Sequence, residues 1–342
     1  MSGLNRVIFS DNLPVLRGLA DASVDLVYVD PPFNTGKRQA RTTTRSVRDA
    51  AGAQRGFHGD RYTSVRLATR SFADQFDDYA GFLEPRLREA RRVLKPTGSL
   101  YLHLDPREVH YVKVLLDQIF GRASFLNEIV WAYDYGARTK KRWAPKHDNI
   151  LVYVVDPRRY YFSQDELDRI PYMAPMLVTE AKRARGKLPT DTWWHTIVSP
   201  TGREKLGYPT QKPLGILRRI VRASCPPGGL VLDFFAGSGT AGAAALDSGR
   251  NFLLVDSNRS AIAVMKRRFA GRDDVEFVGG TRIRPVRAIQ RRVNACAVVK
   301  ASAIRSQVNS SGVVKASARR VRGAQMPSRL RTNSPDSVPT ID

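Results

Sequence analysis

The stretch "GLVLDFFAGSGTAGAAALDSGRNFLLVDSN", residues 229–258, predicts a strand, a glycine-rich turn, a helix and a second strand. Gly237, Gly239 and Gly242 form the pattern G-x-G-x-x-G directly after the first apolar run. Glycines at these positions permit a tight turn and let a ligand approach the backbone at a helix N-terminus. Asp256 ends the second strand, where a carboxylate can hold the ribose hydroxyls of a nucleoside. The stretch therefore predicts a nucleoside-binding α/β unit.

Asp233 ends the first strand of this unit, four residues before Gly237. A carboxylate at that place would repel the pyrophosphate of a dinucleotide and attract a cation, such as the amino group of S-adenosylmethionine (SAM). The charge therefore favours SAM as the cofactor. An NAD(P)-dependent oxidoreductase stays open as an alternative, because the glycine spacing alone does not separate the two.

A second motif, "VYVDPPFNTG" at residues 27–36, joins an apolar strand to a rigid turn. Proline fixes φ and lacks an N–H, so the Asp30-Pro31-Pro32 backbone is stiff and presents carbonyl acceptors without a competing donor. The carboxylate and one fixed carbonyl match the two hydrogens of an amino group. Phe33 adds a flat face on which a base can stack. The motif predicts a site for an exocyclic amine.

Outside these motifs, apolar strands alternate with amphipathic helices. The predicted strands are 6–11, 23–30, 99–105, 148–156 and 275–279, and the predicted helices are 13–20, 77–94, 106–121, 214–225 and 260–270. Such alternation predicts a doubly wound, mainly parallel sheet with helices on both faces. His103 and His147 lie at the ends of buried strands and are expected to be structural.

Together the motifs resemble those of the amino-group DNA methyltransferases, which modify adenine N6 or cytosine N4, in the permuted β arrangement with DPPF before the cofactor motif. The resemblance covers residues 4–270. It rests on DPPF at 30–33, KPTGSLYLHLD at 95–105, KHDNILVY at 146–153, YPTQKP at 208–213, DFFAGSG at 233–239 and Asp256. Phe234 replaces a usual proline and Phe33 a frequent tyrosine, but both keep the needed shape or ring. The resemblance implies a seven-stranded Rossmann-like sheet with an inserted DNA-recognition region.

The resemblance also implies SAM as the cofactor and assigns roles to individual residues; no metal is expected. The implied catalytic residues are Asp30, Pro31, Pro32 and Phe33, and the implied cofactor-binding residues are Asp11, Lys212, Asp233, Phe235, Gly237, Gly239 and Asp256. Asp11 would reach the adenine of SAM, and Lys212 would pair with its carboxylate. Resembling families use Asp or Asn in the tetrapeptide for adenine N6 and Ser for cytosine N4. Asp30 therefore favours adenine, and cytosine N4 stays open as the alternative.

The charge of the chain predicts a polyanionic partner. Lys and Arg number 56 against 32 Asp and Glu, a net charge of +24, and such an excess suits double-stranded DNA. An aromatic, basic stretch at 156–205 is expected to contact it. For the arginine-rich stretch at 37–71 three readings stay open: a clamp on DNA, a cover over the flipped base, or a solvated, partly disordered loop. Trp193 and Trp194 in the stretch 156–205 are core residues or base readers; the sequence leaves both open. A DNA-binding protein without activity is the non-enzymatic alternative.

Six parts follow along the chain. They are the catalytic strand and elbow (1–36), a basic loop (37–71), the catalytic half of the sheet (72–155), a target-recognition region (156–205), the SAM-binding half (206–281) and a basic, disordered tail (282–342). The tail has thirteen Lys and Arg and no acid between residues 282 and 331. Within it, "VNACAVVKASAIR" at 293–305 recurs as "VNSSGVVKASARR" at 308–320.

The cellular setting expected from the sequence is the cytoplasm, in association with the nucleoid. Only two cysteines are present, no secretory start is visible, and the apolar runs are too short for a membrane span. Family members of this arrangement often dimerise, so the resemblance implies a homodimer. It leaves open whether a cognate restriction endonuclease is a partner.

Overall fold

The computed structural model describes residues 5–35, 37–48, 51, 53–55, 61–74, 76–136, 138–199 and 201–279. The predicted tail at 282–342, with its repeated segment, lies outside these residues. The chain divides into two units, Met1–Val293 and Asn294–Asp342, and the fold described below belongs to the first. In the part of the chain that is described, no helix is both long and apolar enough to cross a membrane.

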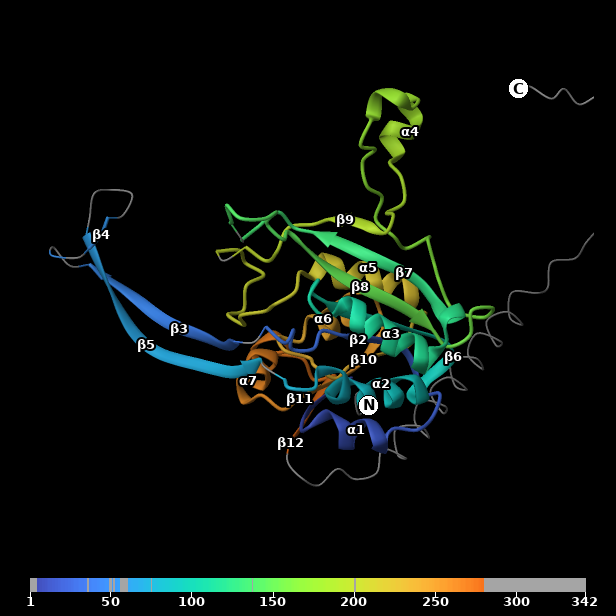
Figure 1. Cartoon of the computed structure of the whole chain (residues 1–342), viewed down its shortest axis with the longest axis horizontal. Helices are drawn as coiled ribbons and strands as arrows, with labels where there is room; N and C mark the ends of the chain where they lie inside the picture. The colour runs from blue at the N-terminus through green and yellow to red at the C-terminus, as the bar shows by residue number, and fades with distance from the viewer. Residues whose placement is uncertain are drawn as a thin grey trace, which may run out of the picture. The chain divides into compact units, whose positions relative to one another are not determined.

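A nine-stranded sheet forms the centre of the fold, in the order β12-β1-β11-β10-β2-β6-β8-β7-β9 (Figure 1). The strands are β1 (Asn5–Phe9), β2 (Val24–Val29), β6 (Leu94–Leu104), β7 (Phe125–Ala132), β8 (His147–Val154), β9 (Thr192–Trp194), β10 (Leu230–Asp233), β11 (Asn251–Asp256) and β12 (Val275–Gly279). Strand β8 is antiparallel to both β6 and β7, and the other neighbours are parallel. The predicted mainly parallel α/β fold is confirmed, with nine strands instead of seven.

Helices cover both faces of this sheet. One face packs against α1 (Asn12–Gly18), α2 (Tyr79–Val93) and α3 (Val109–Phe120), and the other against α5 (Leu214–Ser224), α6 (Thr240–Asp247) and α7 (Arg259–Arg268). Strand β2 shows why both layers are needed. Its residues are all buried, and Val27 and Val29 enter one core while Leu26 and Tyr28 enter the other. Side chains alternate across a strand, so a continuous apolar run requires cover on two faces.

The loop expected over 37–71 is instead an antiparallel β-ribbon in the residues that the structure describes between 37 and 74. Strand β3 (Lys37–Arg48) pairs with β5 (Arg61–Asp74), from Lys37 opposite Asp74 to Arg48 opposite Tyr62, and the short β4 (Gln54–Arg55) pairs with β5. Figure 1 shows this basic ribbon standing away from the central sheet. Neither face of a free ribbon has to be apolar, so the alternation that marks a half-buried strand is missing from its sequence.

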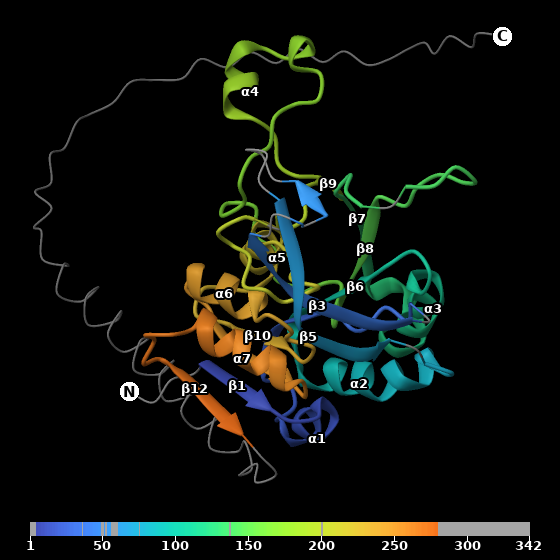
Figure 2. The ribbon, with the colours of Figure 1, turned by 90° about the vertical axis from the view of Figure 1, so that its left-hand side faces the viewer.

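The region 156–205 carries little regular structure. It contains the short helices η2 (Pro175–Leu177) and α4 (Glu180–Arg185), while η1 (Arg122–Ser124) precedes β7. A bridge between Ile170 and Lys187 closes the loop that holds α4. Figures 1 and 2 both show this loop projecting from the body, and we call residues 170–187 the α4 projection.

Candidate active site

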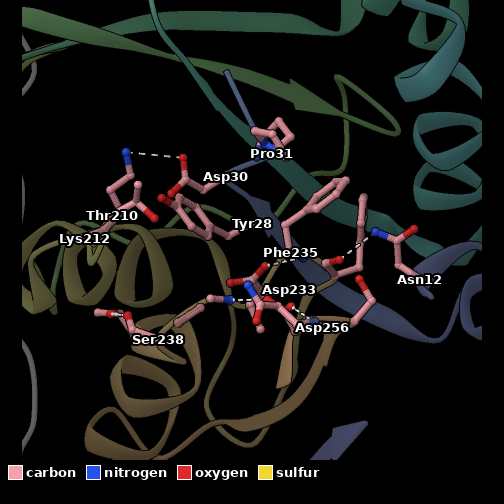
Figure 3. Close-up of a pocket in the computed structure, with 18 of the residues that line it drawn as sticks. Asn12, Tyr28, Asp30, Pro31, Thr210, Lys212, Asp233, Phe235, Ser238 and Asp256 are labelled. Atoms are coloured by element: carbon pink, nitrogen blue, oxygen red, sulfur yellow. Dashed lines mark hydrogen bonds and ion pairs between the residues drawn. The ribbon is translucent and has the colours of Figure 1, made fainter. Parts of the chain in front are cut away.

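A cavity of about 360 Å³ lies at the carboxyl ends of β1, β2, β10 and β11 (Figure 3). Helix α1 leaves β1 for one face of the sheet and α6 leaves β10 for the other, so the chain opens a crevice at this edge. Ten of the eleven predicted site residues line it: Asp11, Asp30, Pro31, Pro32, Phe33, Lys212, Asp233, Phe235, Gly237 and Asp256. Segments about two hundred residues apart in the sequence thus share one site.

The glycine turn forms one wall of the cavity. Gly237 has φ 51°, and its amide donates a 2.7 Å hydrogen bond to Oδ2 of Asp256. A Cβ at Gly237 would lie 3.0 Å from the ring of Tyr208, which also lines the cavity. Gly239 does not line it. This glycine begins α6 with φ 74°, and a Cβ there would lie 2.7 Å from Met265, so Gly239 serves the packing behind the turn.

Buried carboxylates lie beside the turn. Asp233 is 3% exposed and accepts a 3.0 Å hydrogen bond from the amide of Phe235. Burial raises the pKa of Asp233 well above its usual range, and the carboxylates of Asp30 and Asp256 raise it further. Burial also raises the pKa of Asp256 to about 6, although the amides of Asn258 and Gly237 oppose the shift. Because crowded carboxylates destabilise one another, this wall of a basic protein suits a cationic ligand.

Asp11 lies at the rim, where it begins helix α1. Its carboxylate accepts a 2.9 Å hydrogen bond from the amide of Leu13, and its Oδ2 lies 3.7 Å from Nη2 of Arg86. Asn12 beside it donates to the carbonyl of Phe234 at 2.8 Å and accepts from Arg86 at 2.7 Å. These bonds tie α1 and α2 to the strand that carries the glycine turn.

Contacts from two helices fix the DPPF elbow. The hydroxyl of Tyr79 in α2 donates to the carbonyl of Pro32 at 2.7 Å. Asn34, with φ 51°, ends the elbow; its side-chain amide donates to Glu108 at 2.8 Å, and its side-chain oxygen accepts from the amide of Phe76 at 2.9 Å. The stiff backbone expected from the two prolines is thereby anchored on both sides.

A polar network surrounds Asp30. Its Oδ1 lies 3.3 Å from Nζ of Lys212 and 4.0 Å from Nδ1 of His103 (Figure 3 marks the lysine pair). His103 is fully buried, with its ring nitrogens 3.1 Å from the hydroxyl of Tyr28 and 3.2 Å from Asp148. Burial raises the pKa of Asp148, but the hydrogen bond to His103 and the charge of Lys212 outweigh it and bring the pKa to about 2. Asp148 is therefore an ionised, buried acid close to the DPPF elbow.

Several residues of this site were missed from the sequence. They are Asn12, Tyr28, Arg86, Asp148, Tyr208, Thr210, Ser238 and Asn258. Asp148 had the clearest available signal, since a buried acid so close to the apolar run 150–154 of β8 is costly without a partner. His103, expected to be structural, is fully buried, and its contacts place it beside the DPPF elbow.

In the predicted target-recognition region, one tryptophan is buried and the other is exposed. Trp193 is 6% exposed and donates from its indole to the carbonyl of Thr190, so it belongs to the core. Trp194, next in β9, is 70% exposed. The α4 projection exposes Met173 and Met176 almost completely. Apolar and aromatic groups are thus presented to solvent in this region.

The structure has an α/β fold with one cavity between the glycine turn and the DPPF elbow, and comparison with known families identifies the class. A family model described as DNA methylase, with the label N6_N4_Mtase, matches residues 24–267. The chain belongs to this family of DNA methylases.

Two curated relatives align with most of the chain. The type II methyltransferase M.HpaI of Haemophilus parainfluenzae is 28% identical over 274 residues, which cover 80% of this chain and 76% of that protein. The DNA adenine methyltransferase YhdJ of Escherichia coli K12 is 31% identical over 270 residues, covering 77% and 81%.

Solved structures show the same fold at low identity. The cytosine-N4-specific PvuII DNA methyltransferase aligns with a TM-score of 0.53 at 15% identity, covering 85% of this chain and 93% of that one. The M1.HpyAVI–SAM complex aligns with a TM-score of 0.50 at 19% identity, covering 78% and 98%.

Proposed function

We propose that this DNA methylase transfers a methyl group from SAM to adenine N6 in double-stranded DNA. One observation carries the proposal: the Asp30 carboxylate and the glycine turn at Gly237 line the same cavity. An acceptor for an amino group therefore faces a cradle for a nucleoside. The name of YhdJ as a DNA adenine methyltransferase supports adenine, while the cytosine-N4 specificity of the PvuII enzyme keeps cytosine N4 as the second candidate.

The residues of the cavity fit SAM, which carries a sulfonium and an ammonium group. The buried carboxylate of Asp233 matches the ammonium group, the carboxylate of Asp256 can accept hydrogen bonds from the ribose hydroxyls, and the absence of a side chain at Gly237 leaves space beside Tyr208. We assign Asp233 and Phe235 to the methionine part, Asp256 to the ribose and Asp11 to the adenine. When bound, SAM supplies an electrophilic methyl group.

The elbow supplies the remaining chemistry. The lone pair of an exocyclic amine is delocalised into the base, so the amine is a weak nucleophile. If the Asp30 carboxylate and the Pro31 carbonyl accept its two hydrogens, the nitrogen moves towards a tetrahedral geometry and the pair localises. After methylation the nitrogen is a strong acid, and its proton passes to an oxygen of Asp30. The carboxylate therefore need not be a strong base beforehand.

Phe33 would hold the base for this step. The target of a duplex methyltransferase must leave the stack, which costs a few kcal/mol, and stacking on an aromatic ring returns roughly 1–3 kcal/mol. Phe33 lines the cavity next to Asp30, so one residue can stack the base while its neighbour accepts the amine hydrogens.

The basic ribbon and the region 156–205 are the segments that would contact DNA. The ribbon begins at Lys37, four residues after Phe33. Its strands contain nine Lys and Arg (five in β3, one in β4, three in β5) and one acid, Asp74. A two-stranded ribbon fits the major groove, and the cations neutralise phosphates. In 156–205, the exposed Trp194 and the basic α4 are the elements available for base and phosphate contact.

Three further expectations complete the proposal: a homodimer, a cognate restriction endonuclease and a cytoplasmic, nucleoid-associated location. The first two follow from the resemblance. The naming of M.HpaI as a type II methyltransferase supports a restriction partner, since type II denotes a class of restriction system. The location follows from the DNA substrate of the family.

Sequencing of modified bases tests the proposed function. DNA from a methylation-deficient host that expresses the chain should carry N6-methyladenine at one defined sequence, and DNA from a host that expresses Asp30→Ala should not. N4-methylcytosine instead would favour the second candidate. Unmodified DNA from a host that contains the folded protein would contradict both.

A further inference from the structure

The ammonium of Lys212 contacts the carboxylate of Asp30 and the ring of Phe33, the two groups that would hold the target base in the proposed reaction. Its Nζ lies 3.3 Å from Oδ1 of Asp30 and 4.6 Å from the centre of the Phe33 ring. Its side chain is 13% exposed, so the ammonium lies inside the cavity instead of in solvent. Ammonium groups bind carboxylates and aromatic faces favourably, which explains why the lysine rests there.

The same carboxylate and the same ring are the proposed ligands of the target base. An exocyclic amine would donate its hydrogens to Asp30, and the plane of its ring would stack on Phe33. A base that donates to Oδ1 of Asp30 and stacks on the ring face beside Nζ would therefore take the position that the ammonium of Lys212 holds.

A second counter-ion lies within reach of the lysine. Oδ2 of Asp148 is 3.7 Å from Nζ of Lys212, so the ammonium needs to move only about 1 Å to reach charge-assisted hydrogen-bond distance. Asp148 is 8% exposed and is also bonded to His103 at 3.2 Å and Tyr133 at 3.3 Å. The four-carbon side chain of lysine permits the shift without backbone movement.

We propose that Lys212 is a placeholder for the target base: its ammonium holds Asp30 and the Phe33 ring in the absence of DNA and moves to Asp148 when the base enters. This inference rests on the proposed function. It makes Lys212 a positioning residue that keeps the acidic pocket neutralised while it is empty of DNA. It also differs from the role implied by the resemblance, in which the lysine binds the SAM carboxylate.

The test compares two duplexes that differ only at the target position, which is first located by sequencing of methylated DNA. One carries adenine and the other an abasic site, and the ratio of their dissociation constants (abasic over adenine) is measured with S-adenosylhomocysteine present. Adenine has to displace Lys212, whereas an abasic site does not. Lys212→Met should therefore raise the ratio about fivefold, the factor that corresponds to about 1 kcal/mol of displaced ion-pair and cation–π energy.

Asp148→Asn should act in the opposite direction. Without the receiving carboxylate the lysine stays on Asp30, so the ratio should fall below that of the unmodified protein. This variant retains the volume of the side chain, and it keeps the proposal testable if Lys212→Met does not fold. Lys212→Gln serves as a second neutral variant, and thermal unfolding checks each protein.

Lys113→Met is a matched control. Nζ of Lys113 lies 2.7 Å from Asp117 and 4.5 Å from the centre of the Phe125 ring, so it has the same kinds of partner outside the cavity. The ratio should not change in this variant, although its net charge changes equally.

Two outcomes overturn the placeholder while the proposed function stands. A lower ratio in Lys212→Met would mean that the lysine holds the base, and an unchanged ratio with weaker SAM binding would make it a cofactor ligand. Absence of any methylation in the first stage would instead overturn the proposed function, and the placeholder with it.

Discussion

Replacing Gly237 by alanine should weaken SAM binding in addition to destabilising the fold. The residue has φ 51°, a conformation that costs a residue with a Cβ roughly 1–2 kcal/mol. The new Cβ would also lie 3.0 Å from Cε1 of Tyr208, closer than an ordinary van der Waals contact. Tyr208 lines the cavity, so the ring must shift into the space assigned to the cofactor.

Gly249→Ala separates these two effects. Gly249 has φ 69°, and nothing lies within 4 Å of the position of its Cβ, so this variant carries the backbone cost without the contact. Both variants should lose about 1–2 kcal/mol of unfolding free energy. Only Gly237→Ala should lose SAM affinity, by about tenfold, which corresponds to about 1.4 kcal/mol.

Isothermal titration calorimetry with SAM and denaturant unfolding measure the two quantities. Equal loss of SAM affinity in both variants would show that general destabilisation, not the shape of the turn, controls binding. Full SAM affinity in Gly237→Ala would refute the assignment of the cofactor to this turn.

Further predictions concern pH, catalysis and DNA affinity. Burial raises the pKa of Asp256 to about 6, and a cationic ligand favours its ionised form. SAM affinity should therefore rise between pH 5 and 7, with release of protons from the protein to the buffer. Asp256→Asn should flatten this rise, and calorimetry in two buffers measures both effects. Asp30→Ala should lower the rate of methylation by about 10²–10⁴-fold in a filter-binding assay with labelled SAM while DNA affinity stays within about twofold; equal losses of both would contradict its catalytic role. Residues 38–73 can be replaced by a short Gly-Ser linker because Lys37 and Asp74 are paired. This deletion should weaken DNA binding and reduce its dependence on salt concentration. An unchanged salt slope in anisotropy titrations would exclude the ribbon as a phosphate contact.

Much of the fold was predictable, because the α/β core has strong periodic signals. The run Leu26–Val29 is apolar, which indicates a strand buried on both faces, and it forms most of β2. The helix predicted over 77–94 is α2, whose Leu83 and Leu87 lie one turn apart and are buried. In these segments the residues that form the local apolar pattern are the same residues that the fold buries.

The unpredicted elements are those whose stability comes from neighbours instead of from their own pattern. Strand β7 has the sequence FLNEIVWA, with exposed polar residues in its middle, and it forms by pairing with the strongly apolar β8. Strand β9 has only three residues and adds to the edge that β7 provides. The basic ribbon pairs with itself, so its polar sequence carries no burial signal.

The candidate site shows the same division. The DPPF motif and the glycine-rich stretch 229–258 together contain eight of the ten predicted residues that line the cavity. Asp148 and Tyr28 were missed because they meet only through His103, on the strand between theirs in the sheet. The position of Lys212 beside Asp30 likewise depends on how the segment before α5 crosses the cavity, which no local pattern encodes.

The most direct test of the central claim is the identity of the methylated base. Purified protein is incubated with duplex DNA and SAM that carries a deuterated methyl group, and the DNA is digested to nucleosides for mass spectrometry. We expect deuterated N6-methyldeoxyadenosine with the unmodified protein and none with Asp30→Ala. Label in N4-methyldeoxycytidine, or an undiminished yield from Asp30→Ala, would contradict it.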